Sequence, residues 1–343
     1  MDATDRKLLS LIQRDVPVVP RPWDALGEPL GLSGEEVLRR VQTLKAAGII
    51  RQISAIFDTR SLGYTSTLVA VRCLPQREAE VAAVINQHPG VSHNYARNHP
   101  FNLWFTIAVS PQSRFGLERT VEILRQETNA EALRLLPALR VFKIGVQLDV
   151  EADDTQENDV ACEGVRHVTP LPLMPREMEF VRAMQRDLPL VPEPFAETGF
   201  TIQELRQLAA AMRASGRLRR FGAVLQHRRA GFHANAMGVW IVRGPETEVE
   251  TAGKTMARFR AVSHCYQRPT YPDWPYNLFT MVHGHTEAEC EAVLAGISRA
   301  TGLTEYAALY STCEYKKTRV QYFTEAESAW EQQHATAAVV APS

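Results

Sequence analysis

The chain has 343 residues, of which 45% are hydrophobic, enough for about two domains that each bury an apolar core. Its 38 lysines and arginines nearly balance 39 aspartates and glutamates, so the chain lacks the overall positive charge that would attract it to nucleic acid or an anionic membrane. No apolar run reaches the roughly 18 residues of a membrane span. The N-terminal stretch lacks the apolar core of a signal peptide and the five scattered cysteines predict neither a disulfide framework nor a zinc site, so we expect a cytoplasmic protein.

The first predicted elements form a helix-turn-helix. Apolar residues at helical spacing predict a helix over residues 4–15. A second helix is expected to begin after Ser33, a candidate N-cap, and to end at Gly48. A short β-wing should follow from Arg51, and helices followed by a wing are typical of a winged helix-turn-helix.

From Tyr64 onward the pattern changes to strand, helix, strand, strand, helix, strand. This order is that of the ferredoxin-like βαββαβ unit. In such a unit both helices cover one face of the sheet, which leaves the other face open.

The same module returns in the second half of the chain. "QRDVPVVPRPW" recurs as "QRDLPLVPEPF", "RQISAIF" as "RRFGAVL", and "VSHNYAR" as "VSHCYQR", in one order. Near the ends of the copies Lys143 matches Lys317. The second copy also has a longer hairpin loop containing "TYPDWP", which is either a lid or an ordinary insertion.

These patterns predict an α+β protein made of two tandem copies of a winged helix-turn-helix plus a ferredoxin-like βαββαβ domain. The copies are expected to pack as a pseudo-twofold pair. The predicted divisions are a winged helix-turn-helix at 1–62, a ferredoxin-like domain at 63–150, an acidic and then Pro-rich linker at 151–175, the second winged helix-turn-helix at 176–230, the second ferredoxin-like domain at 231–323 and a flexible tail at 324–343.

The same three polar residue types occur on one predicted strand of each copy. We call them the first row (His93, Tyr95 and Arg97) and the second row (His264, Tyr266 and Arg268). Because strand side chains alternate, each row shares one face of its sheet. Buried polar groups need partners, so we expect the rows on the open face, lining a cleft. Arginine can grip a carboxylate, histidine can donate a proton or ligate a metal, and tyrosine can orient the acid.

The P-x-x-P-x-[WF] segments, the "RRFGAVL"-type wing and the H-x-Y-x-R strands resemble those of siroheme decarboxylases, enzymes of heme d1 and alternative heme biosynthesis within the Lrp/AsnC-like superfamily. The chain looks like a fusion of the two subunits. The resemblance implies that siroheme loses two acetate carboxyl groups as CO2 and becomes 12,18-didecarboxysiroheme. It implies no added redox cofactor, because the iron belongs to the substrate. Other proteins of heme d1 biosynthesis are candidate partners, and a homo-oligomer stays open.

The resemblance also suggests site residues. His93 or His264 would donate a proton, assisted by Tyr95 or Tyr266, and either histidine is a candidate ligand of the substrate iron. The expected substrate-binding residues are Arg97, Arg268, Arg51, Arg219, Arg220, Lys143, Lys317, Trp104 and Phe279.

Some of these residues also have a purely structural interpretation. Lys143 and Lys317 could be solvated strand ends, and Trp104 and Phe279 could be core residues. His99, His227 and His233 occur once each and are secondary candidates for the iron.

Two other functions compete with decarboxylation. A transcription regulator of the Lrp/AsnC type would place the helix after Ser33 in the DNA major groove. That helix carries Arg39, Arg40 and Lys45 but begins with two glutamates, which phosphate would repel, so DNA binding is not expected. A protein that binds a tetrapyrrole without turning it over would use the same arginines and histidines, and the sequence does not separate it from an enzyme.

Overall fold

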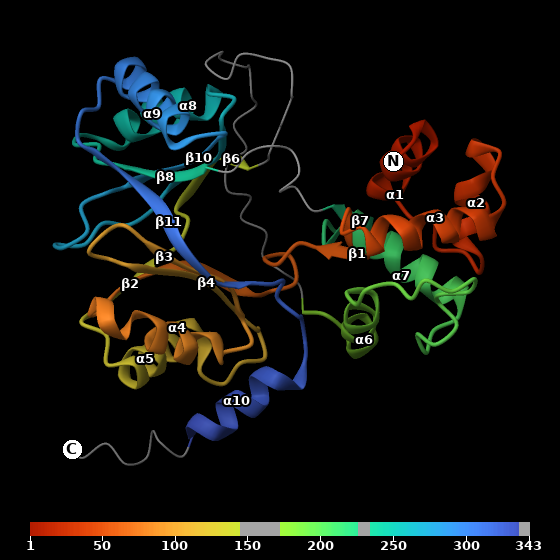
Figure 1. Cartoon of the computed structure of the whole chain (residues 1–343). Helices are drawn as coiled ribbons and strands as arrows, with labels where there is room; N and C mark the ends of the chain where they lie inside the picture. The colour runs from red at the N-terminus through yellow and green to blue at the C-terminus, as the bar shows by residue number, and fades with distance from the viewer. Residues whose placement is uncertain (145–171, 226–233, 336–343) are drawn as a thin grey trace.

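The computed structural model describes residues 1–144, 172–225 and 234–335, which form two bodies joined side by side (Figure 1). One body is mostly helical and the other is built on a large sheet with helices on its outer faces. The predicted α+β class is confirmed. The predicted linker lies outside the described residues as far as residue 171. None of the described helices combines the length and apolar character needed to cross a membrane.

The helical body contains the helix-turn-helix units of both copies around one shared core. Leu8 and Val41 from the first copy join Phe180 and Leu205 from the second, and all four are fully buried. The first copy contributes α1 (Ala3–Arg14), α2 (Pro22–Gly27), η1 (Glu28–Leu30), α3 (Gly34–Ala46) and β1 (Ile50–Phe57), and the second contributes α6 (Pro175–Met184), α7 (Ile202–Ala214) and β7 (Leu218–Leu225). The two predicted winged units therefore form one body.

The predicted wings are strands that pair with each other. β1 and β7 form an antiparallel ribbon in which Ser54 lies opposite Gly222. A Cβ atom at Gly222 would lie 2.6 Å from the carbonyl oxygen of Ile12, so the missing side chain lets α1 approach the ribbon. This pairing between copies, rather than a hairpin within each, connects the two helix-turn-helix units.

Within the described ranges the second sheet has nine strands, in the order β5-β2-β4-β3-β11-β8-β10-β9-β6. The first copy supplies β2 (Thr65–Arg72), η2 (Pro75–Arg77), α4 (Glu78–Asn86), β3 (Val91–Arg97), β4 (Leu103–Val109), α5 (Gly116–Thr128), β5 (Ala132–Leu136) and β6 (Arg140–Ile144). The second supplies β8 (Ala234–Trp240), α8 (Glu246–Arg258), β9 (Val262–Gln267), β10 (Leu278–Gly284), α9 (Glu287–Thr301) and β11 (Tyr306–Lys317).

The last strands of the two copies are exchanged, which the sequence did not predict. β6 pairs with β9 of the second copy, and the C-terminal half of β11 pairs with β3 of the first. In the first copy Pro137 separates β5 from β6, because proline cannot donate to a strand ladder. The second copy has no such break, so β11 runs through both halves of the sheet (Figure 1).

The sheet has a core on each face. α4 and α5 cover the first half and α8 and α9 cover the second, each pair over its own apolar cluster (Figure 1). A further cluster, containing Trp104, Leu136, Met237, Phe279 and Leu309, joins strands of both copies on the face away from these helices. The faces expected to be open therefore pack partly against each other.

The predicted flexible tail is wrong over Glu325–Ala335, which form helix α10, while residues 336–343 lie outside the described part. Trp330 is 5% exposed and its ring centroid lies 4.5 Å from that of His88. The Glu331 carboxylate accepts the backbone N–H of Arg114 at 3.0 Å. The sequence pattern missed the helix because a single tryptophan anchors it and the rest of its surface is polar.

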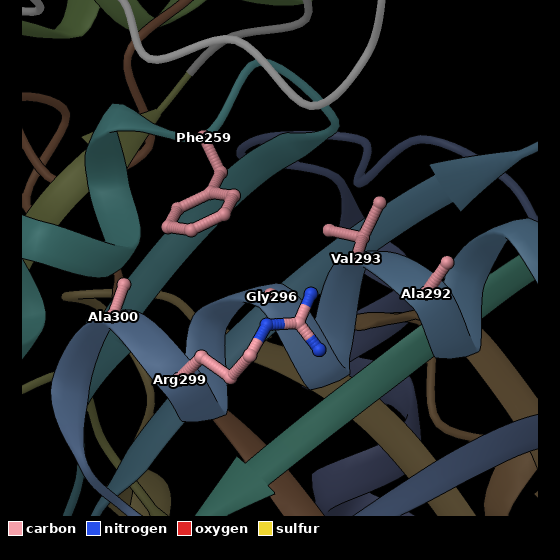
Figure 2. A pocket seen from close by; sticks show the side chains of 6 residues that line it. All are labelled: Phe259, Ala292, Val293, Gly296, Arg299 and Ala300. Carbon is pink, nitrogen blue, oxygen red and sulfur yellow. The ribbon is translucent and has the colours of Figure 1, made fainter.

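The second copy has a pocket of about 390 Å³ at the surface that corresponds to the α10-binding surface of the first copy (Figure 2). Phe259 stands where His88 stands in the first copy, since their carbonyl oxygens accept equivalent N–H groups from Val262 and Val91. The pocket is lined by Phe259, Ala292, Val293, Gly296, Arg299 and Ala300. It lies on the helical side of the sheet, away from the second row.

The docking of α10 gives a stability prediction. Trp330→Ala should lower the free energy of unfolding by about 3–5 kcal/mol, the usual cost of truncating a buried tryptophan. Urea denaturation of both proteins measures the difference. Gln332→Ala, an exposed change on the same helix, should have little effect. A loss below about 1 kcal/mol for Trp330→Ala would mean that α10 is not docked as described.

Candidate active site

Each row lies on the face of its sheet away from the helices, as predicted. The rings of His93 and Tyr95 stack with centroids 6.2 Å apart, and those of His264 and Tyr266 are 6.0 Å apart. The intervening Cys265 points the other way, with its sulfur 3.6 Å from a carbonyl oxygen of α8. The two copies therefore present the same two rings in the same relation.

A β-bulge precedes each histidine. The pairing of β3 with β4 shifts between Val91 and His93, and the pairing of β9 with β10 shifts at the equivalent place. Bulges re-aim side chains and are frequent next to active sites. Here they bring a serine hydroxyl to the Nδ1 atom of each ring, at 3.0 Å for Ser92 and 2.8 Å for Ser263.

The histidines are held in a neutral form near pH 7. Burial, followed by the charges of Lys317 and Arg51, lowers the pKa of His93. Burial, followed by Arg268 and Lys143, lowers the pKa of His264. A neutral ring whose Nδ1 atom is held by a hydroxyl can present its Nε2 atom to a ligand.

Arg97 is buried and Arg268 is half-buried, and neither has an acidic partner among the described residues. A guanidinium N–H of Arg97 donates to the carbonyl oxygen of Leu309 at 2.8 Å, and one of Arg268 donates to that of Leu136. Burial lowers the pKa of each arginine to about 10, so both stay charged at neutral pH. The Nε atoms of both are buried and make no hydrogen bond in the described structure. A guanidinium charge that has no acidic partner favours the binding of an anion.

Four further predicted cations lie nearer the β1–β7 ribbon. The Arg51 guanidinium donates to the carbonyl oxygen of Lys317 at 3.3 Å, and both charges act on His93. Arg219 pairs with Asp58, at 3.1 Å from its Nε atom. Arg220 donates to the carbonyl oxygen of Gln13. Arg51 and Lys317 therefore place positive charge beside the first row, whereas Arg219 acts on Tyr266 of the second row.

Sequence reasoning missed two cations of the same region. Burial, then Arg51 and Arg220, lowers the pKa of Arg319, so its side chain lies among like charges. Arg60 lies close enough to Tyr266 and Arg268 to affect the pKa of both. Arg319 has no matching arginine in the first copy, so a search for repeated residues could not find it. Arg60 matches Arg228 in the repeated wing segment, a pair that the search overlooked.

The side chain of Lys143 points away from the second row, although its charge still lowers the pKa of His264. Its ammonium donates to the carbonyl oxygen of Phe259 at 2.8 Å, at the C-terminal end of α8, where a cation is favourable. In the strand register Lys143 lies opposite Cys265, and the equivalent residue of the second copy is Lys316, which lies opposite Asn94. The predicted match of Lys143 with Lys317 is therefore wrong by one residue.

This register makes the two copies differ beside the histidines. Lys317 lies opposite His93, whereas Ile144 lies opposite His264. The first row thus has a cation from the exchanged strand, and the second has an aliphatic side chain.

The predicted aromatic walls are core residues. Trp104 and Phe279 are each 2% exposed, and both contact Trp274, which comes from the longer loop of the second copy. That loop is fixed to the first copy, because Asp273 accepts two hydrogen bonds of 2.9 Å from Arg134. The insertion therefore packs between the copies.

The secondary histidine candidates do not join the rows. His99 accepts the backbone N–H of Phe101 at 3.0 Å and lies against the ring of Trp274. His227 and His233 fall outside the described residues.

Comparison with known proteins identifies the family. A family model described as the AsnC-like ligand binding domain matches residues 61–143 and 229–316, and one described as the siroheme decarboxylase NirDL-like HTH domain matches residues 5–51. The chain is 41% identical to a siroheme decarboxylase of Hydrogenobacter thermophilus, over 94% of this chain and 96% of that protein. The chain belongs to the siroheme decarboxylase family.

A solved member of the siroheme decarboxylase family has the same fold. The crystal structure of the siroheme decarboxylase NirDL, also determined in co-complex with an iron-uroporphyrin III analogue, matches with a TM-score of 0.78 and 36% identity over 98% of this chain and 99% of that one. The siroheme decarboxylase beta subunit of Methanosarcina barkeri is 44% identical over 42% of this chain and 97% of its own length. The chain therefore corresponds to two such subunits in one polypeptide.

The buried arginines give a prediction about stability. Arg97→Met should leave the free energy of unfolding within about 1 kcal/mol of the original, because relief of the buried charge offsets the lost hydrogen bond to Leu309. Arg134→Met, which breaks the ion pair with Asp273, is the reference and should cost about 1–2 kcal/mol. Chemical denaturation compares the two. A loss above about 3 kcal/mol for Arg97→Met would make the guanidinium a structural group.

Proposed function

We propose that the chain is a siroheme decarboxylase that removes two acetate carboxyl groups of siroheme and yields 12,18-didecarboxysiroheme in heme d1 or alternative heme biosynthesis. The observation that carries the proposal is the 41% identity to a siroheme decarboxylase along nearly the whole chain. The site agrees with this chemistry, because two arginines without an acidic partner among the described residues, together with further cations, suit a substrate with many carboxylates.

The reaction needs a proton and no electron acceptor. In each round the bond between an acetate methylene carbon and its carboxyl carbon breaks, and the electron pair stays on the methylene carbon, where the macrocycle delocalises it. CO2 leaves and a proton adds to that carbon, so the oxidation state of the substrate's iron is unchanged at the end. The proposed enzyme is therefore a carboxy-lyase without an added redox cofactor.

The rows supply the two groups that this step requires. Arg97 or Arg268 would hold a carboxylate, and the Nε2 atom of His93 or His264 would give the proton. The tyrosines would orient the acid, since their rings stack on the histidines. The histidine that does not donate is a candidate ligand for the substrate's iron. We expect the reaction in the cytoplasm, with other heme d1 biosynthesis proteins as candidate partners.

The alternative of a DNA-binding regulator is not favoured. The cations of α3 are already paired: Arg39 and Arg40 bond to Glu36, Arg40 also bonds to Asp2 at 2.8 Å, and Lys45 pairs with Asp187 at 2.5 Å. Phosphate contacts would have to break these pairs.

The decisive assay follows the mass of the tetrapyrrole. Purified protein mixed anaerobically with siroheme should lower its mass by two CO2 units, with the intermediate that has lost one unit appearing first. Mass spectrometry measures the change.

Protein denatured before mixing is the control. A shifted absorbance spectrum with an unchanged mass would replace the enzyme by a tetrapyrrole-binding protein, the other alternative. Salt-dependent retention of a specific DNA fragment would revive the regulator.

A further inference from the structure

A second histidine is linked to the second row. The hydroxyl of Ser263 lies 2.8 Å from Nδ1 of His264 and 2.6 Å from Nε2 of His283. Nδ1 of His283 lies 2.5 Å from the side-chain oxygen of Asn235, which is exposed. The Ser263 hydroxyl also lies 3.4 Å from the carbonyl oxygen of Met281. A chain of hydrogen bonds therefore runs from the row to the surface.

The described residues of the first copy form no such chain. Alanine takes the place of His283: the N–H of Ala108 donates to Gly90, as that of His283 donates to the equivalent Ala261. The hydroxyl of Ser92 bonds instead to the hydroxyl of Thr106 at 2.8 Å. The Thr106 hydroxyl in turn lies 3.5 Å from Nδ1 of His93. Ala108 is part of the buried core that holds the helix-turn-helix units. Among the described residues, the hydroxyl network beside His93 therefore closes on His93 itself and reaches no exposed side chain.

The two rings of the second copy can exchange protons through Ser263. Burial and the nearby His264 lower the pKa of His283 to about 4, so at neutral pH it has one N–H and one acceptor nitrogen. A hydroxyl between two such rings donates to one and accepts from the other. With the Asn235 oxygen facing Nδ1, the neutral His283 ring carries its proton on Nδ1 and accepts the Ser263 hydroxyl at Nε2. The opposite direction of proton donation needs the Asn235 amide turned so that its NH2 group faces Nδ1.

We propose that His283 and Ser263 relay protons from solvent to His264, which makes the second copy the one that holds the proton donor. The inference rests on the proposed decarboxylation and adds the donor and its supply. His283 acts through His264 and is a positioning and relay residue.

Each round moves one proton from solvent to carbon. His283 takes up a proton at Nδ1 and gives its Nε2 proton to the Ser263 oxygen, whose own proton moves to Nδ1 of His264. His264 then gives its Nε2 proton to the methylene carbon as CO2 leaves. Both rings are then protonated at Nδ1, and each must return its proton to Nε2 by exchange with water before the second round. Two decarboxylations consume two protons, so a donor without a supply would be spent after the first.

Variants of His283 test the relay. With siroheme as substrate, His283→Ala should lower kcat at least tenfold while KM stays within about twofold. Added imidazole, which can enter the space left by the ring, should restore part of the rate. His283→Phe fills that space and should not respond to imidazole. Ser263→Ala should also lose at least tenfold, and Ser263→Thr, which keeps the hydroxyl, should lose less.

The matched control is Thr106→Val, which removes the hydrogen-bond partner of Ser92 in the first copy. It should keep kcat within about twofold. A loss equal to that of His283→Ala would contradict the assignment of the donor to the second copy.

The possible results separate the relay from the reaction. If the unmodified protein decarboxylates siroheme and His283→Ala keeps its full kcat, the relay is wrong and the proposed function stands. A raised KM without rescue by imidazole would mean a structural role and would also overturn it. If His283→Ala does not fold, equal rates for Ser263→Ala and Ser263→Thr would refute the relay. Siroheme of unchanged mass with the unmodified protein would overturn the proposed function, and the relay with it.

Discussion

The exchange of the final strands is the constraint on which the rest of the molecule depends. Because of it, β3 is held between β4 and β11, and β9 between β10 and β6, so each row lies on a strand that is paired on both sides. Side chains on such strands are more precisely held than those on loops. Leu309 and Leu136, which lie just before the exchanged segments, accept hydrogen bonds from Arg97 and Arg268, so each guanidinium of the rows is bonded to the other copy. Neither copy could build its row alone.

Local features were predictable because they depend on short stretches of sequence. The repeat, the helix after Ser33 and the shared face of each row follow from periodicity and alternation, which depend on residues close in the chain. Strand partners are different, since apolar alternation is the same whether β6 pairs within its own copy or with β9. For the same reason the wings were assigned to separate units, and the sequence contained no local sign that β1 pairs with β7.

Other differences between the sequence predictions and the structure concern single residues. Matching Lys143 with Lys317 fails because Lys316 and Lys317 are adjacent, and only the strand register identifies Lys316 as the equivalent of Lys143. Trp104 and Phe279 were assigned to pocket walls because aromatic residues suit both a ring-binding surface and a core, and only the packing of Trp274 decides between them. His283 has no counterpart in the first copy, so a search based on repetition could not find it. The copies share a scaffold and differ in the residues beside each histidine.

The long strand β11 also has a consequence for biosynthesis. Its C-terminal half completes the sheet of the first copy, yet residues 311–317 are translated more than two hundred positions after β3, their partner. Until they emerge from the ribosome, β3 has an unpaired edge, which is a site for wrong pairing with other chains. Contacts so distant in sequence also slow folding. Compared with two separately made subunits, the fused polypeptide keeps the missing strand at a high effective concentration, which limits the lifetime of that exposed edge.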